Sequence, residues 1–375
     1  MFVHHTRLEP QLVPSDYTSD ASFDAERSAI FEQQWHFVGL TGDLSSPDDY
    51  IAADVLGVPV VCRNIGGELR AFQNVCVHRH SRIVPAGAGH RRQLRCQYHG
   101  WEYGDEGQVA KIPDGKSFKG IRTAGLCLQR YRVERLGSLV FVNLSATAPG
   151  LRESLDDLTA ELDYFFGDHY RIWHWINEYP VNWKVIVENA VESYHVPMLH
   201  PSTFMDYKKE EHHEHRLHPA FTSYLDTAPM GNSVIETGFR SFTALTAKTI
   251  HFERAKHIHV FPNHLFEVRE VYSLFSTLEP LAAGRTRLVS MGFLPRDIKF
   301  PFVNRPIQRL FGRTLTHMIR KIAGEDVGIW SEVQQGLRHS SHTGILGSRE
   351  ERVYAFQQHL AERLHKVVDA GPGGS

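Results

Sequence analysis

The spacing of hydrophobic and polar positions changes near residue 150. Before it, short apolar runs such as VPVVCR and SLVFVNL alternate with glycine-containing segments, a pattern typical of short β-strands. After it, leucines recur at helical spacing in LRESLDDLTAELDYFF, over 151–166. We therefore expect a small antiparallel β domain over 37–150. A helical segment over 1–36 precedes it, and residues 151–375 form a second domain.

The second domain combines both kinds of element. A helix is predicted over 184–196, and strand-like runs follow in HIHVFP, LFEVREVYSLFSTL and TRLVSMGFLP, the last two joined by a turn at EPLAAG. Two further helices are predicted over about 325–338 and 349–366. Together the two domains predict an α+β protein.

Composition and charge exclude several classes of protein. The 375 residues are 42% hydrophobic, and 41 basic residues against 43 acidic ones give a formal charge of −2, so no nucleic-acid or anionic membrane surface is indicated. The N-terminus MFVHHTRLEP lacks the apolar core of a signal peptide, and no window approaches the roughly 20 apolar residues of a membrane span. We expect a cytoplasmic protein.

Cysteine and histidine usage points to metal chemistry. Four cysteines are too few to staple a chain of this length, and a cytoplasmic protein keeps them reduced, which favours metal binding wherever their neighbours suit it. The 24 histidines are not all candidates. His212, His213 and His215 alternate with charged residues in KKEEHHEHRLH and are expected on a solvated segment.

The strongest motif is a pair of cysteine–histidine segments, CVHRH and CQYHGW. They place Cys76 and His78, then Cys96 and His99, with 17 residues between the two halves. Two thiolates and two imidazoles in this alternating order suit a [2Fe-2S] cluster with the thiolates on one iron and the imidazoles on the other. A structural zinc site also takes two cysteines and two histidines, but it usually pairs like with like in sequence. At all four ligands and in the flanking His-Gly-Trp, the motif resembles the signature of Rieske proteins.

A second motif lies in NWKVIVENAVESYHVPMLH. On a continuous helix Glu188, Glu192 and His195 would point the same way, and Pro197 would disrupt that helix so that His200 returns from the loop that follows. Two converging imidazoles supply two-thirds of a 2-His-1-carboxylate iron site, which leaves positions open for dioxygen.

The third ligand of such a site is expected from GEDVGIWSEVQQGL. Asp326 shares the apolar stripe formed by Trp330, Val333 and Leu337, at intervals of four, three and four residues. Glu325 and Glu332 fall on other faces and are interpreted as solvated helix charges. We therefore predict a mononuclear iron held by these ligands: His195, His200 and Asp326.

The resemblance to Rieske oxygenases covers most of the chain, from the cluster motif through NWK…ESYH…H to ED…VQQGL. It implies a helix-grip catalytic domain with a curved antiparallel sheet and a long C-terminal helix, and a head-to-tail homotrimer. It also implies a reductase or ferredoxin partner that supplies electrons from NAD(P)H. In that family a carboxylate three residues before the first iron-binding histidine bridges to a Rieske histidine of the next protomer. Here this residue is Glu192, where many members have Asp, and Glu188 is a candidate second-shell partner.

The substrate is the least determined part of this interpretation. The strands over about 220–295 would line the pocket, and their aromatic and aliphatic residues suit a small apolar or aromatic molecule. Some relatives with Glu at the bridging position oxidise quaternary ammonium compounds, which aromatic side chains can bind, and others hydroxylate rings or demethylate small aromatic acids. The resemblance thus leaves open whether the reaction is monooxygenation, dioxygenation or oxidative demethylation. Two other classes stay open: an electron-transfer protein that uses only the cluster, and a zinc-stabilised protein that binds small ligands without catalysis.

Overall fold

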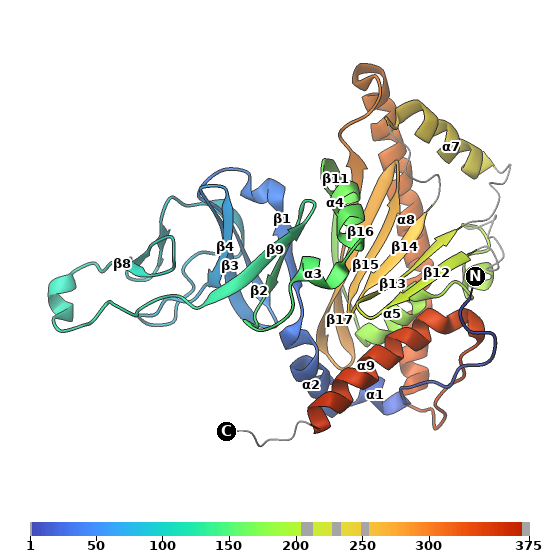
Figure 1. Cartoon of the computed structure of the whole chain (residues 1–375), viewed down its shortest axis with the longest axis horizontal. Helices are drawn as coiled ribbons and strands as arrows, with labels where there is room; N and C mark the ends of the chain where they lie inside the picture. Colours follow the sequence, from blue (N-terminus) through green and yellow to red (C-terminus); the bar gives the residue numbers. More distant parts are fainter. Residues whose placement is uncertain (1, 204–212, 227–233, 249–254, 370–375) are drawn as a thin grey trace. The chain divides into compact units, whose positions relative to one another are not determined.

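The computed structural model describes residues 2–203, 213–226, 234–248 and 255–369. Within them the chain forms two compact units, one of residues 31–163 and one that joins residues 1–30 to 164–375 (Figure 1). Helices and strands are mixed, and the second unit combines a curved antiparallel sheet with a long C-terminal helix. The predicted α+β class is confirmed.

The unit of residues 31–163 is built on a seven-stranded antiparallel sheet. In pairing order its strands are β1 (His36–Leu40), β10 (Leu139–Asn143), β9 (Arg130–Leu136), β4 (Glu68–Gln73), β3 (Val58–Ile65), β2 (Asp49–Val55) and β5 (Gly87–His90). A smaller sheet contains β6 (Leu94–Arg95), β7 (Glu102–Tyr103) and β8 (Val109–Lys111). A buried core between the strands of this unit includes Phe72, Leu94, Trp101 and Tyr103, and it contains the cysteines of the cluster motif. Burial of these apolar side chains holds the motif loops on the small sheet.

The stretch predicted to be helical over 151–166 is helical, but it is divided into two helices. Helix α3 (Leu151–Leu155) ends where Asp156 takes a positive φ of 49°, and α4 (Leu158–Phe166) begins two residues later. Aspartate is one of the few residues that tolerate a positive φ, which periodicity does not reveal. Leucines on both sides of the break are buried, as their spacing predicted.

The larger unit contains a second seven-stranded antiparallel sheet. In pairing order its strands are β11 (His169–Tyr179), β17 (Arg285–Pro295), β16 (Tyr272–Ala282), β15 (His264–Arg269), β14 (Lys256–Val260), β13 (Phe221–Asp226) and β12 (His213–His218). The run LFEVREVYSLFSTL is therefore two strands and not one. Arg269 pairs with Tyr272, so the two residues between them form a tight hairpin turn inside an apolar run.

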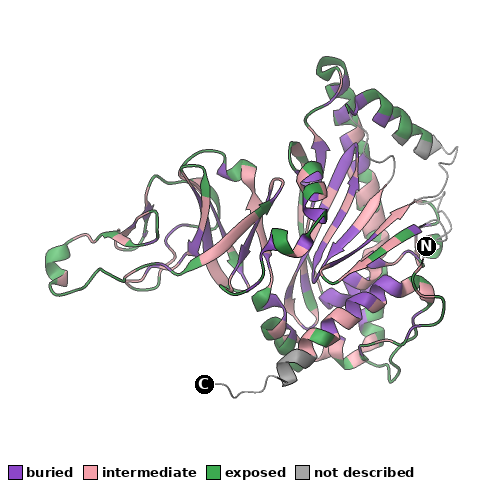
Figure 2. Ribbon diagram, in the orientation of Figure 1, coloured by how far each residue is buried: buried purple, intermediate pink, exposed green. Residues whose placement is uncertain are grey.

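Helices lie against this sheet and against one another. They are α1 (Pro14–Thr18), α2 (Asp20–Ala29), α5 (Trp183–Val191), α6 (Val196–Leu199), α7 (Val234–Thr246), α8 (Pro301–Leu337) and α9 (Glu351–Asp369). Figure 1 shows α8 behind the strands, where it contacts β11 and β17. Figure 2 shows that α5 is largely buried whereas much of α8 is exposed. None of the described helices has an apolar stretch long enough to cross a membrane.

Helix α8 is much longer than the predicted 325–338. It begins at Pro301 and continues through Gly312, where an added Cβ would lie 2.9 Å from a methyl carbon of Leu294 on β17. The glycine thus permits close packing of helix on sheet. This packing stabilises a helix whose first half lacks a clear amphipathic stripe, so its start could not be predicted from periodicity.

Candidate metal centres

The two cysteine–histidine segments form loops with the same backbone hydrogen bonds. The N–H of Cys76 donates to the carbonyl five residues later at 2.9 Å, and the N–H of His80 donates back to the Cys76 carbonyl at 2.9 Å. In the second loop Cys96 and Gly100 make the equivalent bonds at 2.8 and 3.0 Å. His80 and Gly100 occupy the same place in the two loops, and both have positive φ, 61° and 74°. The repeated turn presents each pair of candidate ligands in a similar way.

The donors of these loops separate by type. The thiols of Cys76 and Cys96 are buried and hydrogen-bonded to each other, and Tyr103 donates to the Cys76 Sγ at 3.0 Å. The rings of His78 and His99 lie 4.7 Å apart, centroid to centroid. In the described part of the chain, His78 Nδ1 is buried without a hydrogen-bond partner, so it is available as a ligand. Thiols together on one side and imidazoles on the other fit a [2Fe-2S] cluster.

A single zinc ion would need the four donors of these loops around one centre. The pairing of thiol with thiol and of imidazole with imidazole favours a cluster with two irons over such an ion.

The second motif does not lie on one helix, so that prediction was wrong. Helix α5 ends at Val191, and Glu192 is extended, with φ −121° and ψ 169°. The Glu192 Oε2 accepts hydrogen bonds from the backbone N–H groups of Tyr194 and His195, the latter at 3.2 Å. A side chain that bonds to the following backbone competes with the helical pattern, which explains the early end.

Glu188 does not reach the predicted histidines. Its carboxylate accepts hydrogen bonds from Tyr17 at 2.5 Å and from Gln357 at 3.0 Å. Burial raises the pKa of Glu188, against the opposing effect of these bonds. The structure therefore places its hydrogen bonds where α5 meets α1 and α9, and not at His195 or His200.

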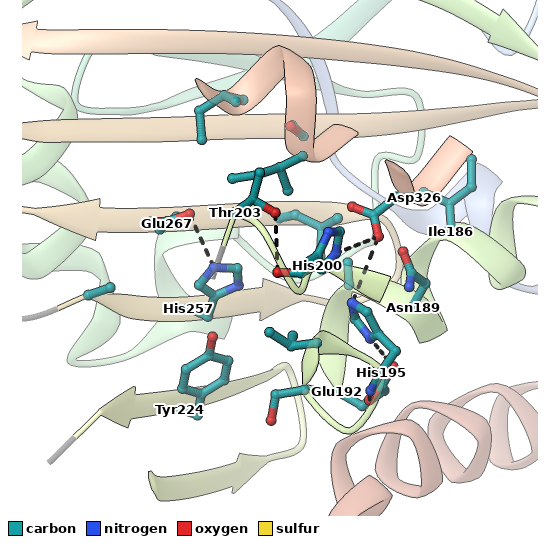
Figure 3. A pocket seen from close by; sticks show the side chains of 18 of the residues that line it. Ile186, Asn189, Glu192, His195, His200, Thr203, Tyr224, His257, Glu267 and Asp326 are labelled. Atoms are coloured by element: carbon teal, nitrogen blue, oxygen red, sulfur yellow. Dashed lines mark hydrogen bonds and ion pairs between the residues drawn. The ribbon is translucent and has the colours of Figure 1, made fainter. Parts of the chain in front are cut away.

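Three predicted ligands do converge. The Asp326 Oδ1 lies 3.1 Å from the Nε2 of His200 and 3.8 Å from the Nε2 of His195 (Figure 3). Asp326 comes from α8, whereas the histidines flank α6 on the segment after α5. Burial raises the pKa of Asp326, although the two imidazoles and a hydrogen bond from Asn189 act in the opposite direction. A bound cation would stabilise the carboxylate, and the donor set fits a 2-His-1-carboxylate iron site.

Each of the two imidazoles is held at Nδ1 by a glutamate. Glu192 bonds to His195 Nδ1, and the Glu325 Oε2 lies 2.7 Å from His200 Nδ1. With Nδ1 bonded to a carboxylate, Nε2 is left to face Asp326. Carboxylates at this position orient metal-binding histidines and raise their basicity.

Glu325 was wrongly interpreted as a solvated helix charge. Besides His200, it accepts a hydrogen bond from Thr203 at 2.7 Å, and these two bonds lower the pKa of Glu325. Glu332, by contrast, is exposed as expected. The clue that could have identified Glu325 is that a metal-binding histidine needs an acceptor for its second ring nitrogen.

Asn189 is another residue that sequence reasoning missed. Trp330 donates its Nε1–H to the Asn189 Oδ1 at 2.7 Å, which leaves the amide N–H₂ to donate to Asp326. Asn189 lies on α5 and the other two residues on α8. The amide therefore links the two helices and orients the third candidate ligand.

A cavity of about 380 Å³ lies beside the three converging residues. Aliphatic side chains from α5, α8 and the sheet form part of its wall: Ile186, Leu265, Leu288, Met318, Ile319 and Ile322. The sheet also contributes polar side chains, contrary to the expected apolar lining: His213, Tyr224, Asp226, His257, Glu267, Arg269, Tyr272 and Ser276. The cavity suits a small molecule with both apolar and polar parts.

The histidines of KKEEHHEHRLH were wrongly expected on a solvated segment. His213 is buried on β12 and lines the cavity, and His215 bonds to the buried Glu351 at 2.9 Å. Strand alternation places both on the same face, so their spacing of two was the available clue. His212 lies outside the described residues.

Comparisons with known proteins cover nearly the whole chain. Residues 159–366 match the family described as ring hydroxylating alpha subunit, catalytic domain, and residues 34–131 match the Rieske [2Fe-2S] domain. The carnitine monooxygenase oxygenase subunit of Acinetobacter baumannii is 25% identical over 373 residues, 93% of each chain. The chloroplastic choline monooxygenase of Spinacia oleracea is 30% identical over 52% of this chain and 47% of its own.

Solved structures share the fold. A quaternary ammonium Rieske monooxygenase in complex with L-carnitine superimposes with a TM-score of 0.76 at 23% identity, over 95% of both chains. Naphthalene 1,2-dioxygenase with bound indole superimposes with a TM-score of 0.73 at 19% identity, over 96% of both chains. At these identities the likeness concerns the fold.

Proposed function

The chain belongs to the ring-hydroxylating alpha-subunit family of Rieske non-heme iron oxygenases, and from this premise we propose that it oxidises a small quaternary ammonium compound. It is the oxygenase subunit of such a system, an oxidoreductase with a Rieske [2Fe-2S] domain and a mononuclear iron domain. The observation that carries the proposal is that one chain contains two donor sets of different kind. An electron-transfer protein would need only the first.

The donor sets assign the cofactors to residues. Cys76, His78, Cys96 and His99 would hold the cluster, and the mononuclear iron would be held by these three residues: His195, His200 and Asp326. When bound, the two centres supply electron relay and dioxygen activation. The chain's own contribution is to orient the imidazoles through Glu192 and Glu325 and to surround the substrate with a partly apolar cavity.

Glu192 is proposed as the link between subunits. Its carboxylate bonds to His195 Nδ1, which is the contact that the bridging carboxylate of the family is expected to make. The bridge requires the Rieske histidine of a neighbouring copy, so a head-to-tail homotrimer is part of the proposal. A reductase or ferredoxin that draws on NAD(P)H would supply the electrons.

Two observations support a quaternary ammonium substrate. The relative that matches 93% of the chain is named for carnitine, and another is named for choline. The cavity is also lined by the ring of Trp330, which is linked through Asn189 to Asp326 at the candidate iron end. An aromatic face favours a cation.

Small aromatic acids are the second candidate. The large subunit of 2-halobenzoate 1,2-dioxygenase from Burkholderia cepacia is 29% identical over 49% of this chain and 42% of its own. The aliphatic side of the cavity, which includes Met318, Ile319 and Ile322 on α8, could contact a ring. Product analysis distinguishes the two classes.

Metal content and oxygen uptake test the proposal. Purified protein should contain about three irons per chain and show Rieske absorbance, since a cluster has two irons and the second site has one. With a reductase and NAD(P)H, it should consume oxygen with carnitine- or choline-like compounds and form an oxidised product. Two irons per chain would indicate an electron-transfer protein, and zinc without visible absorbance a non-catalytic binder.

Asp326→Ala tests the mononuclear site directly. The variant should lose about one iron per chain and its substrate oxidation, because the carboxylate ligand is gone, while the Rieske absorbance stays. Iron analysis, the visible spectrum and oxygen uptake measure these three outcomes. An unchanged iron count with wild-type turnover would remove Asp326 from the site.

A further inference from the structure

Polar side chains form a row across three strands of the cavity wall. Tyr224 on β13 pairs with His257 on β14, and His257 pairs with Glu267 on β15. Directly paired residues point to the same face of a sheet, so this polar row of Tyr224, His257 and Glu267 faces the cavity as one surface. Figure 3 shows the polar row on one side and the three candidate iron ligands on the other.

Glu267 is fully engaged within the protein. Its Oε2 lies 3.2 Å from the His257 Nε2, and its Oε1 accepts a hydrogen bond from the Tyr272 hydroxyl. Burial raises the pKa of Glu267, but the bonds from His257 and Tyr272 and the charge of Arg269 outweigh burial and bring it to about 2. Glu267 is therefore an anion whose role is to hold His257, and not to contact a ligand.

His257 keeps one ring nitrogen for another partner. Because Glu267 is an ionised acceptor, the His257 Nε2 carries the hydrogen of their bond. The Nδ1 has no hydrogen-bond partner among the described residues, and the ring lines the cavity. One face of the imidazole is stacked on Tyr224, with ring centroids 5.0 Å apart and planes at 10°. Its orientation is thus set from two sides.

The Tyr224 ring is also held in place by its neighbours, whereas its hydroxyl makes no hydrogen bond to the described residues. The ring is stacked against His213 as well as His257, and the Arg352 guanidinium lies 5.1 Å from its centroid. Burial and the charge of Glu267 raise the pKa of Tyr224, so the hydroxyl stays protonated. Among the described residues it has no hydrogen-bond partner, and the half-buried ring lines the cavity. A ligand that displaces water from this hydroxyl binds well only when it forms a hydrogen bond in return.

We propose that Tyr224 and His257 bind an oxygen-bearing group of the substrate at the end opposite the carbon that is oxidised: the Tyr224 hydroxyl donates to a carboxylate or hydroxyl oxygen, and the His257 Nδ1 accepts from a hydroxyl. This inference rests on the proposed function, since it takes the same cavity as the substrate site. The aliphatic wall then contacts the middle of the molecule. A purely hydrocarbon substrate would leave the tyrosine hydroxyl and the imidazole nitrogen without hydrogen-bond partners, so it should bind more weakly.

Binding of two matched series to the holoenzyme tests this. The first comprises trimethylammonium compounds with a four-carbon chain that ends in a carboxylate, a hydroxyl or a methyl group; the second is benzoate, benzyl alcohol and toluene. Isothermal titration calorimetry should show that the oxygen-bearing members bind at least about tenfold more tightly than the methyl member of the same series. The carboxylate and hydroxyl arms show which of the two groups the site takes.

Two variants test whether these residues cause the preference for oxygen-bearing over methyl-ended ligands. Tyr224→Phe keeps the ring that stacks on His257 and should reduce this preference about tenfold, because only the oxygen-bearing ligands should bind more weakly. His257→Asn should change the preference in the same direction. Tyr354→Phe on α9, outside the cavity, is the matched control and should retain the wild-type preference. The visible spectrum and circular dichroism confirm that each variant is folded.

The outcomes separate this inference from the proposed function. A preference that depends on Tyr224 supports the inference even if only the aromatic series is oxidised, which would overturn the quaternary ammonium proposal alone. Equal binding of methyl-ended ligands, an equal loss for all ligands in Tyr224→Phe, or no binding in either series would each overturn the inference.

Discussion

At the scale of single residues, the candidate iron site depends on glutamates that are not ligands. Glu192 and Glu325 bond to the Nδ1 of His195 and His200, and so turn both Nε2 atoms toward Asp326. Mutation of such hydrogen-bond partners typically lowers metal affinity or activity by about 10- to 100-fold. The two glutamates can be tested separately, because only Glu192 is also proposed as a bridge between subunits.

Removal of Glu325 should weaken iron binding. In Glu325→Ala the ring of His200 loses its acceptor, so the mononuclear iron content should fall under dialysis, by about tenfold or more in affinity, while the Rieske absorbance is unchanged. Glu332→Ala, on an exposed position of the same helix, is the matched control. Iron retention equal to that of the control would show that Glu325 does not position the ligand.

Replacement of Glu192 should separate metal binding from electron transfer. Glu192→Gln keeps an oxygen acceptor near His195 but removes the charge, so both metal centres should remain while substrate oxidation slows by about 100-fold or more. Metal analysis combined with single-turnover oxidation of the pre-reduced enzyme measures both quantities. Wild-type turnover in this variant would refute the bridge.

At the scale of elements, a buried ion pair anchors helix α5 to helix α2. Lys184 pairs with Glu26 on α2, with almost no exposure of either side chain, and Trp183 donates to the same carboxylate at 2.8 Å. The N-cap Asn182 accepts from the Lys184 N–H at 2.9 Å. This helix carries Asn189 and leads into Glu192, so its anchoring positions the site. The N-terminal helices are therefore part of the catalytic unit.

Breaking that ion pair should destabilise the protein strongly. Lys184→Met leaves Glu26 as an uncompensated buried charge, which typically costs about 3–5 kcal/mol in the free energy of unfolding. Chemical denaturation of the larger unit measures the loss. The double variant Lys184→Met/Glu26→Gln should recover a substantial part of it, and a single variant as stable as the wild type would contradict this account.

At the scale of the whole molecule, buried and half-buried histidines with a lowered pKa link stability to pH. Burial lowers the pKa of His36, His169 and His213 to about 4 and that of His259 to about 3. On unfolding, each returns to an ordinary pKa near 6.5 and takes up a proton below that pH. Their contribution to stability is therefore complete above about pH 6.5 and is lost as the pH falls toward 4.

The pH dependence of unfolding tests this account. His259→Gln removes one titrating group but keeps a donor for the Pro262 carbonyl, which His259 contacts at 2.8 Å. The slope of unfolding free energy between pH 6 and 4 should decrease by up to about 1.4 kcal/mol per pH unit. His317→Gln, at an exposed position of α8, should keep the wild-type slope. Equal slopes in all three proteins would contradict the assignment.

The sequence by itself determined the family, the α+β class and the enzyme class. It could do so because the cysteine–histidine motif is local: spacings of two and three residues set the chemistry before any fold is known. It also selected His195, His200 and Asp326, whose donor atoms the structure brings within 4.8 Å of one another. Their assignment as iron ligands stays a prediction until metal is measured.

The tertiary structure alone decided what surrounds those residues. The end of α5 at Val191 depends on the bonds of one carboxylate, and the contact of Glu325 with His200 joins positions 125 residues apart. The row of Tyr224, His257 and Glu267 exists only through strand pairing. Periodicity reports which face of an element is buried, but not which distant element covers it, because register and helix ends are set by long-range contacts.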